Sequence, residues 1–212
     1  MAIDGKMFRE CMGRFPSGVV IATTVDKEGK RWGFTASAFS SLSLDPPLIL
    51  VCLDLRAESH PVFISANKFA VNILRPEHEK VAMRFASKGG DKFSGGEFKA
   101  GKLGMPILPN ALVSLECNMN AKYEMGDHTI LVGLIEHSVV QDGSAMTYLG
   151  GKFYKLPPEE SKERKTTAKK KIVAQPTSKK KTAKQPVTGT KKSVKKPATG
   201  QKKPKAASKK KA

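Results

Sequence analysis

The sequence contains few cysteines and no long apolar segment. Cys11, Cys52 and Cys117 are far apart and form no CxxC pair, so the spacing of structural zinc sites and disulfide frameworks is absent. No run approaches the roughly 18 apolar residues that a membrane helix needs. The charged start MAIDGKMFRE also lacks the apolar region of a secretory signal. We therefore expect a cytoplasmic protein with reduced cysteines and no membrane association.

The usual nucleotide-binding and nucleophile motifs are also missing. The sequence has no GxGxxG after its first strand, no GxxxxGK[ST], no GxSxG and no HExxH, which argues against Rossmann, P-loop, serine-hydrolase and zinc-protease chemistry. The four histidines, His60, His78, His128 and His137, are scattered over three predicted elements. No metal site is predicted.

Residues 157–212 lack Phe, Tyr and Trp and carry 19 Lys and 1 Arg against 3 Glu, or +17 of the total charge of +19. Such a composition cannot bury enough apolar surface to offset its ordering entropy, so it predicts a disordered C-terminal tail. The tail resembles the lysine-rich tails of linker histones and of bacterial DNA-associated proteins. It favours non-specific binding to DNA, RNA or another polyanion, or serves as a solubilising extension. Association with the nucleoid would follow from the first reading.

Residues 1–156 carry a charge of only +2 and have the length of one compact domain. Helical spacing predicts helices over 4–15, 60–67 and 76–86, with Asp4 as an N-cap. Strands are expected over 19–25, 30–39, 48–54, 68–74, 111–125 and 128–140, with a short one at 146–149 and a glycine-rich loop over 87–106.

These strands do not alternate regularly with long helices, which favours a small antiparallel barrel over a doubly wound parallel sheet. Several of them lack clean polar–apolar alternation, so both of their faces should be buried. Helices or a second subunit would supply that cover, and a homodimer is expected.

The segment GFTASAFSSLSLDPP, residues 33–47, concentrates hydroxyl side chains beside small residues at a strand end. Small side chains let a ligand approach the backbone, and hydroxyl and N–H groups can hold a phosphate or a polar ring edge. Serine is also frequent in ordinary turns, so this segment alone is a weak signal.

The order of several segments is more specific. FPSGVVIATT, GFTASAFSSLSLDPPLILVCLD, FAVNIL, RFASKGGDKF, GDHTILVGLIE and YLGGKFYKL follow one another between Met7 and Leu156. This arrangement resembles the flavin reductase family with the FMN-binding split barrel, the reductase components of two-component flavin monooxygenases. The resemblance implies a mainly β, antiparallel, Greek-key-like split barrel with short flanking helices over residues 1–156. It also implies hydride transfer from NADH or NADPH to FMN or FAD, supplied to a partner monooxygenase.

The resemblance further implies roles for individual residues. Flavin contacts would come from Thr35, Ala36, Ser37, Ala38, Phe39, Ser40, Ser41, Cys52, Leu53, Asp54, Ser59, Phe85, Ala86, Ser87, Lys88, Lys92 and Phe93. Among these, Lys88 and Lys92 would contact the phosphate. His128 of the GDH motif would lie near the nicotinamide as the catalytic orienting donor, and Tyr148, Gly151 and Tyr154 would close over the pyridine nucleotide.

Each assignment has an alternative. His128 is also compatible with a solvated turn, Lys88 and Lys92 with surface lysines, and Phe85 and Phe93 with the core. Ala38 replaces a serine that many relatives have. For the whole chain, the alternative is a nucleic-acid-associated protein whose barrel binds flavin without useful turnover.

Overall fold

The computed structural model describes residues 3–156; the predicted lysine-rich tail lies outside them. Its helices are α1 (Gly5–Gly13), α2 (His60–Ser65), the 3-10 turn η1 (Pro76–His78) and α3 (Glu79–Ala86). Its strands are β1 (Ser17–Gly18), β2 (Val20–Val25), β3 (Arg31–Ala36), β4 (Phe39–Ser43), β5 (Leu48–Asp54), β6 (Lys68–Ile73), β7 (Lys99–Ala100), β8 (Pro106–Ile107), β9 (Val113–Met125), β10 (His128–Val140), β11 (Met146–Leu149) and β12 (Lys152–Lys155). No helix of this part of the chain is long and apolar enough to cross a membrane.

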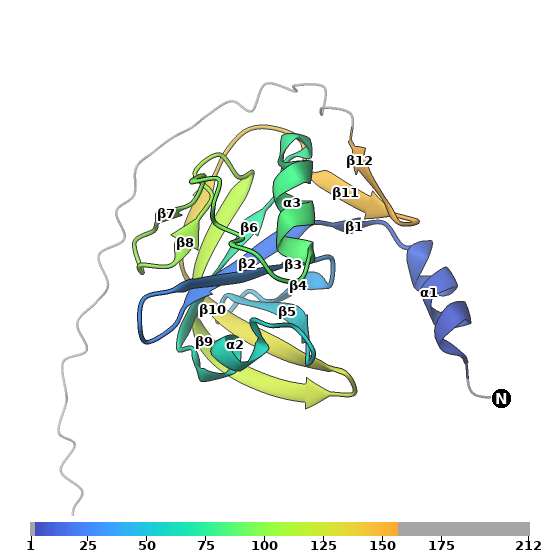
Figure 1. Cartoon of the computed structure of the whole chain (residues 1–212), viewed down its shortest axis with the longest axis horizontal. Coiled ribbons are helices and arrows are strands. Elements are labelled where there is room, and N and C mark those ends of the chain that lie inside the picture. The colour runs from blue at the N-terminus through green and yellow to red at the C-terminus, as the bar shows by residue number, and fades with distance from the viewer. Residues whose placement is uncertain (1–2, 157–212) are drawn as a thin grey trace, which may run out of the picture. The chain divides into compact units, whose positions relative to one another are not determined.

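Seven strands form one antiparallel sheet in the order β3-β2-β6-β9-β10-β5-β4, rolled into the split barrel that the sequence predicted (Figure 1). Its two longest strands, β9 and β10, are adjacent inside the sheet and form a hairpin. It turns at Gly126, whose φ of 65° lies in the left-handed region that glycine adopts without strain. The turn brings His128, the first residue of β10, opposite Asp54 at the end of β5.

The barrel has one core inside and another outside. Val20 and Ala22 of β2 point into the inner core with Phe63 and Phe69. Val19 and Ile21 point the other way into an outer core, which α3 covers from within the chain. Each fully buried phenylalanine contributes about 1.5–3 kcal/mol of hydrophobic stabilisation. Burial on both faces explains why β2 shows no polar–apolar alternation.

Gly33 allows α3 to pack directly on the barrel. A Cβ at this position would lie 2.8 Å from the Ala22 carbonyl oxygen and 2.8 Å from Cε1 of Phe85, closer than real Cβ contacts permit. Nearby, the Thr35 hydroxyl donates to the Ala82 carbonyl at 2.6 Å. These two contacts fix the position of α3 against β3. The two elements form two walls of the candidate site described below.

Several features differ from the predicted elements. The strand expected over 30–39 bends at Ser37 into β3 and β4, and β4 pairs with β5. The bend is secured by Cys52, whose N–H donates to the Ala38 carbonyl at 3.0 Å. The glycine-rich segment contains β7 and β8, and neither β1 nor β12 was predicted.

The glycine-rich segment is fastened to the barrel by a buried carboxylate. Glu116 is 2% exposed and accepts the N–H groups of Lys102 and Leu103, both at 2.8 Å. Charge-assisted hydrogen bonds of this kind offset the cost of burying an ionised group.

Candidate functional site

A pocket of about 460 Å³ opens where β3 and β5 end and β10 begins, beside the C-terminus of α3. This volume lies in the range typical of ligand sites. The sequence-predicted residues that line it are Thr35, Ala36, Ser37, Ala38, Cys52, Leu53, Asp54, Ser59, Phe85, Ala86, Ser87, Lys88, Lys92 and His128. Segments far apart in sequence thus converge on one hollow.

Other residues assigned through the resemblance lie elsewhere. Phe39, Ser40 and Ser41 follow the bend onto β4 and do not line the pocket. Phe93 packs in the outer core, with ring centroids 4.9 Å from Phe85 and 5.2 Å from Phe98, and lines a neighbouring hollow.

The three residues expected over the pyridine nucleotide are also outside the pocket. Tyr148 and Tyr154 belong to β11 and β12, and Gly151 lies in the turn between them. These strands pair with β1 in a separate three-stranded sheet, and none of the three residues lines the pocket of its own chain.

The basic edge of the pocket differs in burial between its two lysines. Lys88 is exposed, whereas Lys92 is half-buried and its ammonium lies 3.3 Å from the Phe85 carbonyl oxygen. Burial lowers the pKa of Lys92, and the neighbouring Glu58 carboxylate acts in the opposite direction. A partly desolvated ammonium interacts more strongly with a phosphate than an exposed one.

Ser59 provides a polar group without a partner. Its side chain is 3% exposed, and its hydroxyl forms no hydrogen bond within the described chain although it lines the pocket. An unpaired buried hydroxyl costs about 1–3 kcal/mol. A ligand that bonds to this hydroxyl would remove that cost.

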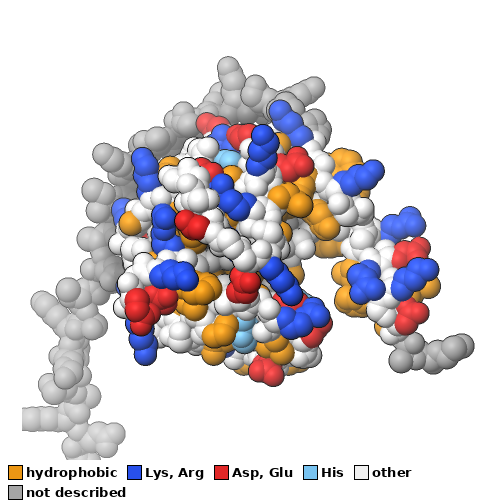
Figure 2. Space-filling model, viewed as in Figure 1, with side chains coloured by type: hydrophobic (Ala, Val, Ile, Leu, Met, Phe, Trp, Pro, Cys, Tyr) orange, Lys and Arg blue, Asp and Glu red, His pale blue; other side chains and the backbone are white. Residues whose placement is uncertain are grey.

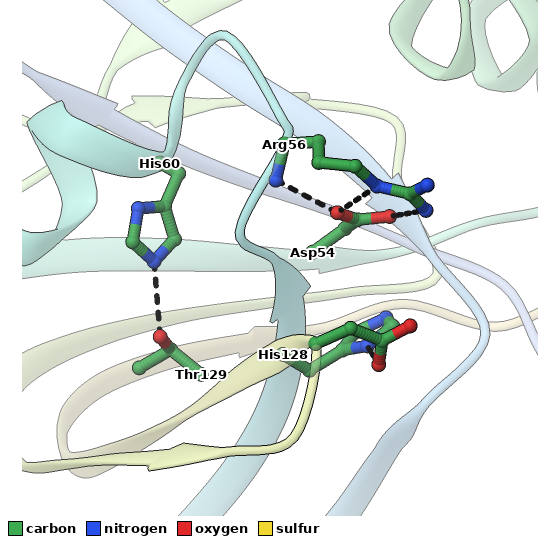
Figure 3. Close-up of polar contacts among 6 residues, drawn as sticks. Asp54, Arg56, His60, His128 and Thr129 are labelled. Atoms are coloured by element: carbon green, nitrogen blue, oxygen red, sulfur yellow. Dashed lines mark hydrogen bonds and ion pairs between the residues drawn. The ribbon is translucent and has the colours of Figure 1, made fainter.

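Sequence reasoning missed four lining residues, Phe34, Arg56, Ala57 and Glu58. Three of them, Arg56, Ala57 and Glu58, lie between the predicted residues Asp54 and Ser59, so joining those two positions into one wall would have found them. Arg56 donates three hydrogen bonds to the Asp54 carboxylate (Figure 3). Its Nε and Nη2 donate at 3.0 and 2.7 Å, and its backbone N–H donates at 2.7 Å. The Arg56 guanidinium holds the pKa of the Asp54 carboxyl well below its usual range.

His128 lines the pocket beside Asp54, its register partner on the adjacent strand β5 (Figure 3). Its Nδ1 is 2.7 Å from Oδ1 of Asp127, and this hydrogen bond lowers the pKa of Asp127. The bond fixes one ring nitrogen to the carboxylate and leaves Nε2 for other contacts. His60 instead bonds through Nε2 to Thr129 Oγ1 at 2.9 Å and does not line the pocket.

The pocket residues fit a flavin. Phe34, Leu53 and Phe85 give apolar surface for a ring, and Ala36, Ser37 and Ala38 have small side chains that leave the backbone accessible. Lys88, Lys92 and the unpartnered Ser59 hydroxyl provide charge and hydrogen bonding for a phosphate. Among residues 3–156, no group of three or more His, Cys, Asp or Glu side chains is arranged to hold a metal ion.

Comparison with known proteins identifies the class. The flavin reductase like domain matches residues 12–157, more than half of the chain, and the protein belongs to this family. It is accordingly an oxidoreductase of the flavin reductase class, with the split-barrel fold of that class.

Individual relatives carry different names. The chain is 45% identical over 157 residues to the actinorhodin polyketide dimerase of Streptomyces coelicolor, covering 74% of this chain and 89% of the relative. It is 32% identical over 161 residues to the flavin-dependent monooxygenase reductase subunit HsaB of Rhodococcus jostii, covering 76% and 82%.

A solved structure shares the fold. The NADH:FAD oxidoreductase SgcE6 of Streptomyces globisporus C-1027, in complex with NAD and FAD fragments, superposes with a TM-score of 0.70 at 33% identity, covering 76% of this chain and 99% of that chain.

Proposed function

We propose that the protein transfers a hydride from NADH or NADPH to FMN or FAD. With one proton from solvent, the products are the oxidised nicotinamide and the dihydroflavin. The observation that carries this proposal is the convergence of an apolar wall, small residues, Lys92 and the unpartnered Ser59 hydroxyl in one pocket. The structural relative SgcE6 is named an NADH:FAD oxidoreductase, which supports a reduced nicotinamide as the hydride donor.

Bound flavin supplies the electron-accepting centre, so the protein needs no nucleophile of its own. Lys92, Lys88 and Ser59 hold the phosphate end. Phe34, Leu53 and Phe85 exclude water from one side of the ring. His128, with Nδ1 tied to Asp127, orients the donor and offers Nε2 as a polar contact. These roles amount to positioning and electrostatic stabilisation.

NADH and NADPH oxidation by the full-length chain, with and without added FMN or FAD, tests this function. We expect the rate of nicotinamide oxidation to rise with flavin concentration until it saturates. We also expect one of the two donors, NADH or NADPH, to be oxidised faster than the other. Absence of flavin-dependent turnover with every donor and flavin combination would refute the proposal and favour the alternative of a flavin-binding protein without turnover.

We further propose that reduced flavin passes to a separate monooxygenase. The name of HsaB as a monooxygenase reductase subunit supports such a partner. If reduced flavin leaves the pocket, a flavin-dependent monooxygenase in a second dialysis chamber should turn over when NADH and this protein are confined to the first. A requirement for mixing the two proteins would instead indicate direct contact.

We also propose a homodimer. Met7, Phe8 and Met12 of α1 are each at least half exposed, and no residue of this helix is buried within the chain. Hydrophobic side chains on α1, at the right of the molecule, are visible in Figure 2.

Light scattering of the full chain tests the dimer. Phe8→Asp should yield a monomer, because a charge would enter the apolar contact. Arg9→Ala on the same helix is the matched control and should remain dimeric. A monomeric wild type at micromolar concentration would contradict the proposal.

For residues 157–212 we propose non-specific binding to DNA, RNA or another polyanion, which would place the enzyme at the nucleoid within the cytoplasm. The charge of +17 supports this, since lysines that neutralise phosphates release counterions. Fluorescence anisotropy with duplexes of different sequence should give salt-sensitive binding by the full chain and none after truncation at Leu156. Equal binding by both chains would exclude the tail as the cause.

A further inference from the structure

Asp54 and Arg56 form an ion pair at the pocket, and the proposed hydride transfer gives neither of them a role. Both oxygens of the Asp54 carboxylate accept hydrogen bonds from Arg56. Asp54 is the last residue of β5 and is the register partner of His128, the first residue of β10. Register partners on adjacent strands lie on the same face of a sheet. The Asp54 carboxylate therefore faces His128 as a fixed negative charge.

A second carboxylate approaches the same imidazole from the turn before β10. Oδ1 of Asp127 lies 2.7 Å from Nδ1 of His128. The backbone carbonyl of Asp127 also accepts the Leu55 N–H at 3.0 Å, which ties this turn to the segment that carries Arg56. Backbone and side-chain hydrogen bonds thus hold two carboxylates and one guanidinium around His128.

The charges of this cluster balance when His128 is protonated. Hydrogen bonds from Arg56 hold the pKa of the Asp54 carboxyl below its usual range, and the bond with His128 does the same for Asp127. Both carboxylates are therefore ionised near neutral pH. They carry two negative charges against the single positive charge of Arg56. An imidazolium at His128 supplies the second positive charge.

The remaining titratable groups that line the pocket are Cys52, Glu58, Lys88 and Lys92. The Cys52 thiol is uncharged near neutral pH because burial raises its pKa. Glu58 accepts the Gly89 N–H, and both lysines follow α3 on the opposite, basic edge. On its other side, β9 places the uncharged Met125 opposite His128. Asp54, Asp127 and Arg56 are therefore the charges that act most directly on this imidazole.

The chemistry of the hydrogen bond indicates the same charge state. An ionised Asp127 can only accept, so Nδ1 of His128 carries the proton of their 2.7 Å bond. A neutral imidazole with its proton on Nδ1 has only an acceptor at Nε2. To donate from Nε2, the ring must hold both protons and a positive charge. Hydride transfer places negative charge on the acceptor, and a positively charged donor stabilises it.

We propose that Asp54 and Arg56 are positioning residues that together set the charge of His128, the carboxylate favouring the imidazolium and the guanidinium limiting that effect. This inference rests on the proposed function, because it takes His128 as the donor beside the nicotinamide. Neither Asp54 nor Arg56 touches the reacting atoms. Both act through His128, and flavin reduction slows as the pH rises through the titration of this residue.

Removing the two charges should move the titration of His128 in opposite directions. Asp54→Asn removes a negative charge, so the midpoint should fall to lower pH. Arg56→Gln removes a positive charge, so the midpoint should rise. Each shift should be about half a pH unit, the scale of one charge acting across solvent. Proton NMR of the full chain without flavin or coenzyme measures this midpoint, and the His128 signal is identified by its loss in His128→Ala.

Two control variants separate charge from structure. Lys88→Gln removes a positive charge from the same pocket and should shift the midpoint less than Arg56→Gln does. The reason is that, within residues 3–156, the ion pairs of the two carboxylates are with Arg56 and His128. Arg56→Lys keeps the charge but loses the planar two-pronged contact, and it should titrate close to the wild type. If Arg56→Lys shifts the midpoint as far as Arg56→Gln, an action through charge is overturned.

Stopped-flow reduction of flavin by NADH links the titration to the reaction. The fall in rate should occur at lower pH in Asp54→Asn and at higher pH in Arg56→Gln, following the NMR midpoint of each variant. The proposal is overturned if the midpoint is the same in both variants, if both move it in one direction, or if the rate profile does not follow it. Opposite NMR shifts in a chain whose wild type reduces no flavin would contradict the proposed function and leave the action of Asp54 and Arg56 on His128 in place.

Discussion

Lys92→Gln provides the sharpest test of the flavin pocket. The Lys92 ammonium is half-buried and spends one donor on the Phe85 carbonyl at 3.3 Å, which leaves two donors for a ligand. A charge-assisted hydrogen bond in such a place contributes about 1.5–3 kcal/mol. That is roughly a 10- to 150-fold change in Kd. Riboflavin lacks the phosphate, so its Kd should change by less than about twofold.

Quenching of flavin fluorescence gives both dissociation constants. Lys88→Gln is the matched control, because Lys88 lines the same pocket but is exposed. Its loss should cost no more than about 1 kcal/mol for FMN. If Lys92→Gln weakens FMN and riboflavin equally, the lysine acts through the loop that it ties to Phe85. If Lys92→Gln weakens the binding of neither FMN nor riboflavin, the flavin phosphate does not bind at Lys92 and the proposed phosphate site is wrong.

Three further predictions concern the walls of the pocket. Gly33→Ala should destabilise the fold by about 1–3 kcal/mol, because the added methyl meets the Ala22 carbonyl oxygen and Phe85 at 2.8 Å. Thermal unfolding should then shift down by about 2–4 °C per kcal/mol, and Gly18→Ala, which has open space around it, should not shift; equal melting of the two would contradict the close approach. Burial raises the pKa of Cys52 and raises that of Cys117 to about 12, so a thiol reagent near neutral pH should modify exposed Cys11 fast, Cys52 slowly and Cys117 only after unfolding. Bound FMN should protect Cys52, and mass spectrometry that finds it equally modified with and without FMN would remove this strand from the site. His128→Ala should slow flavin reduction in stopped flow by about 100-fold, as for a misplaced reactant, and leave the Kd for FMN unchanged; an unchanged rate would exclude an orienting role.

The barrel could be predicted from sequence because its signals are local. Asp4 caps α1 as predicted, accepting the Met7 N–H at 2.7 Å. The hairpin of β9 and β10 follows from two long apolar runs joined by a glycine turn. The bend at Ser37 had no such signal. It depends on a bond between Cys52 and Ala38, which are distant in sequence, and small polar residues suit a strand and a bend equally well.

The same limit applies to the site. The segments that resemble the family placed most of the pocket, since each contributes a short contiguous wall. Arg56 and Glu58 were missed because their roles depend on Asp54 and on the Gly89 N–H, and no spacing in the sequence shows those contacts. Phe85 belongs to both alternatives: it is 1% exposed in the outer core and also lines the pocket.

The proposed reaction uses no protein nucleophile, and this has a consequence for how relatives differ. If the pocket only positions two cofactors, its residues do not indicate which molecule finally receives the electrons. This agrees with the comparisons, where a relative at 45% identity is named a polyketide dimerase and one at 32% a monooxygenase reductase subunit. Differences in role must therefore lie in how tightly the flavin is held and in what lies around the pocket. Under the proposed function, the features of this chain that would set these differences are Lys92, the Ser59 hydroxyl and the charged residues 157–212. Selection among acceptors then depends on the surroundings of the pocket rather than on its chemistry.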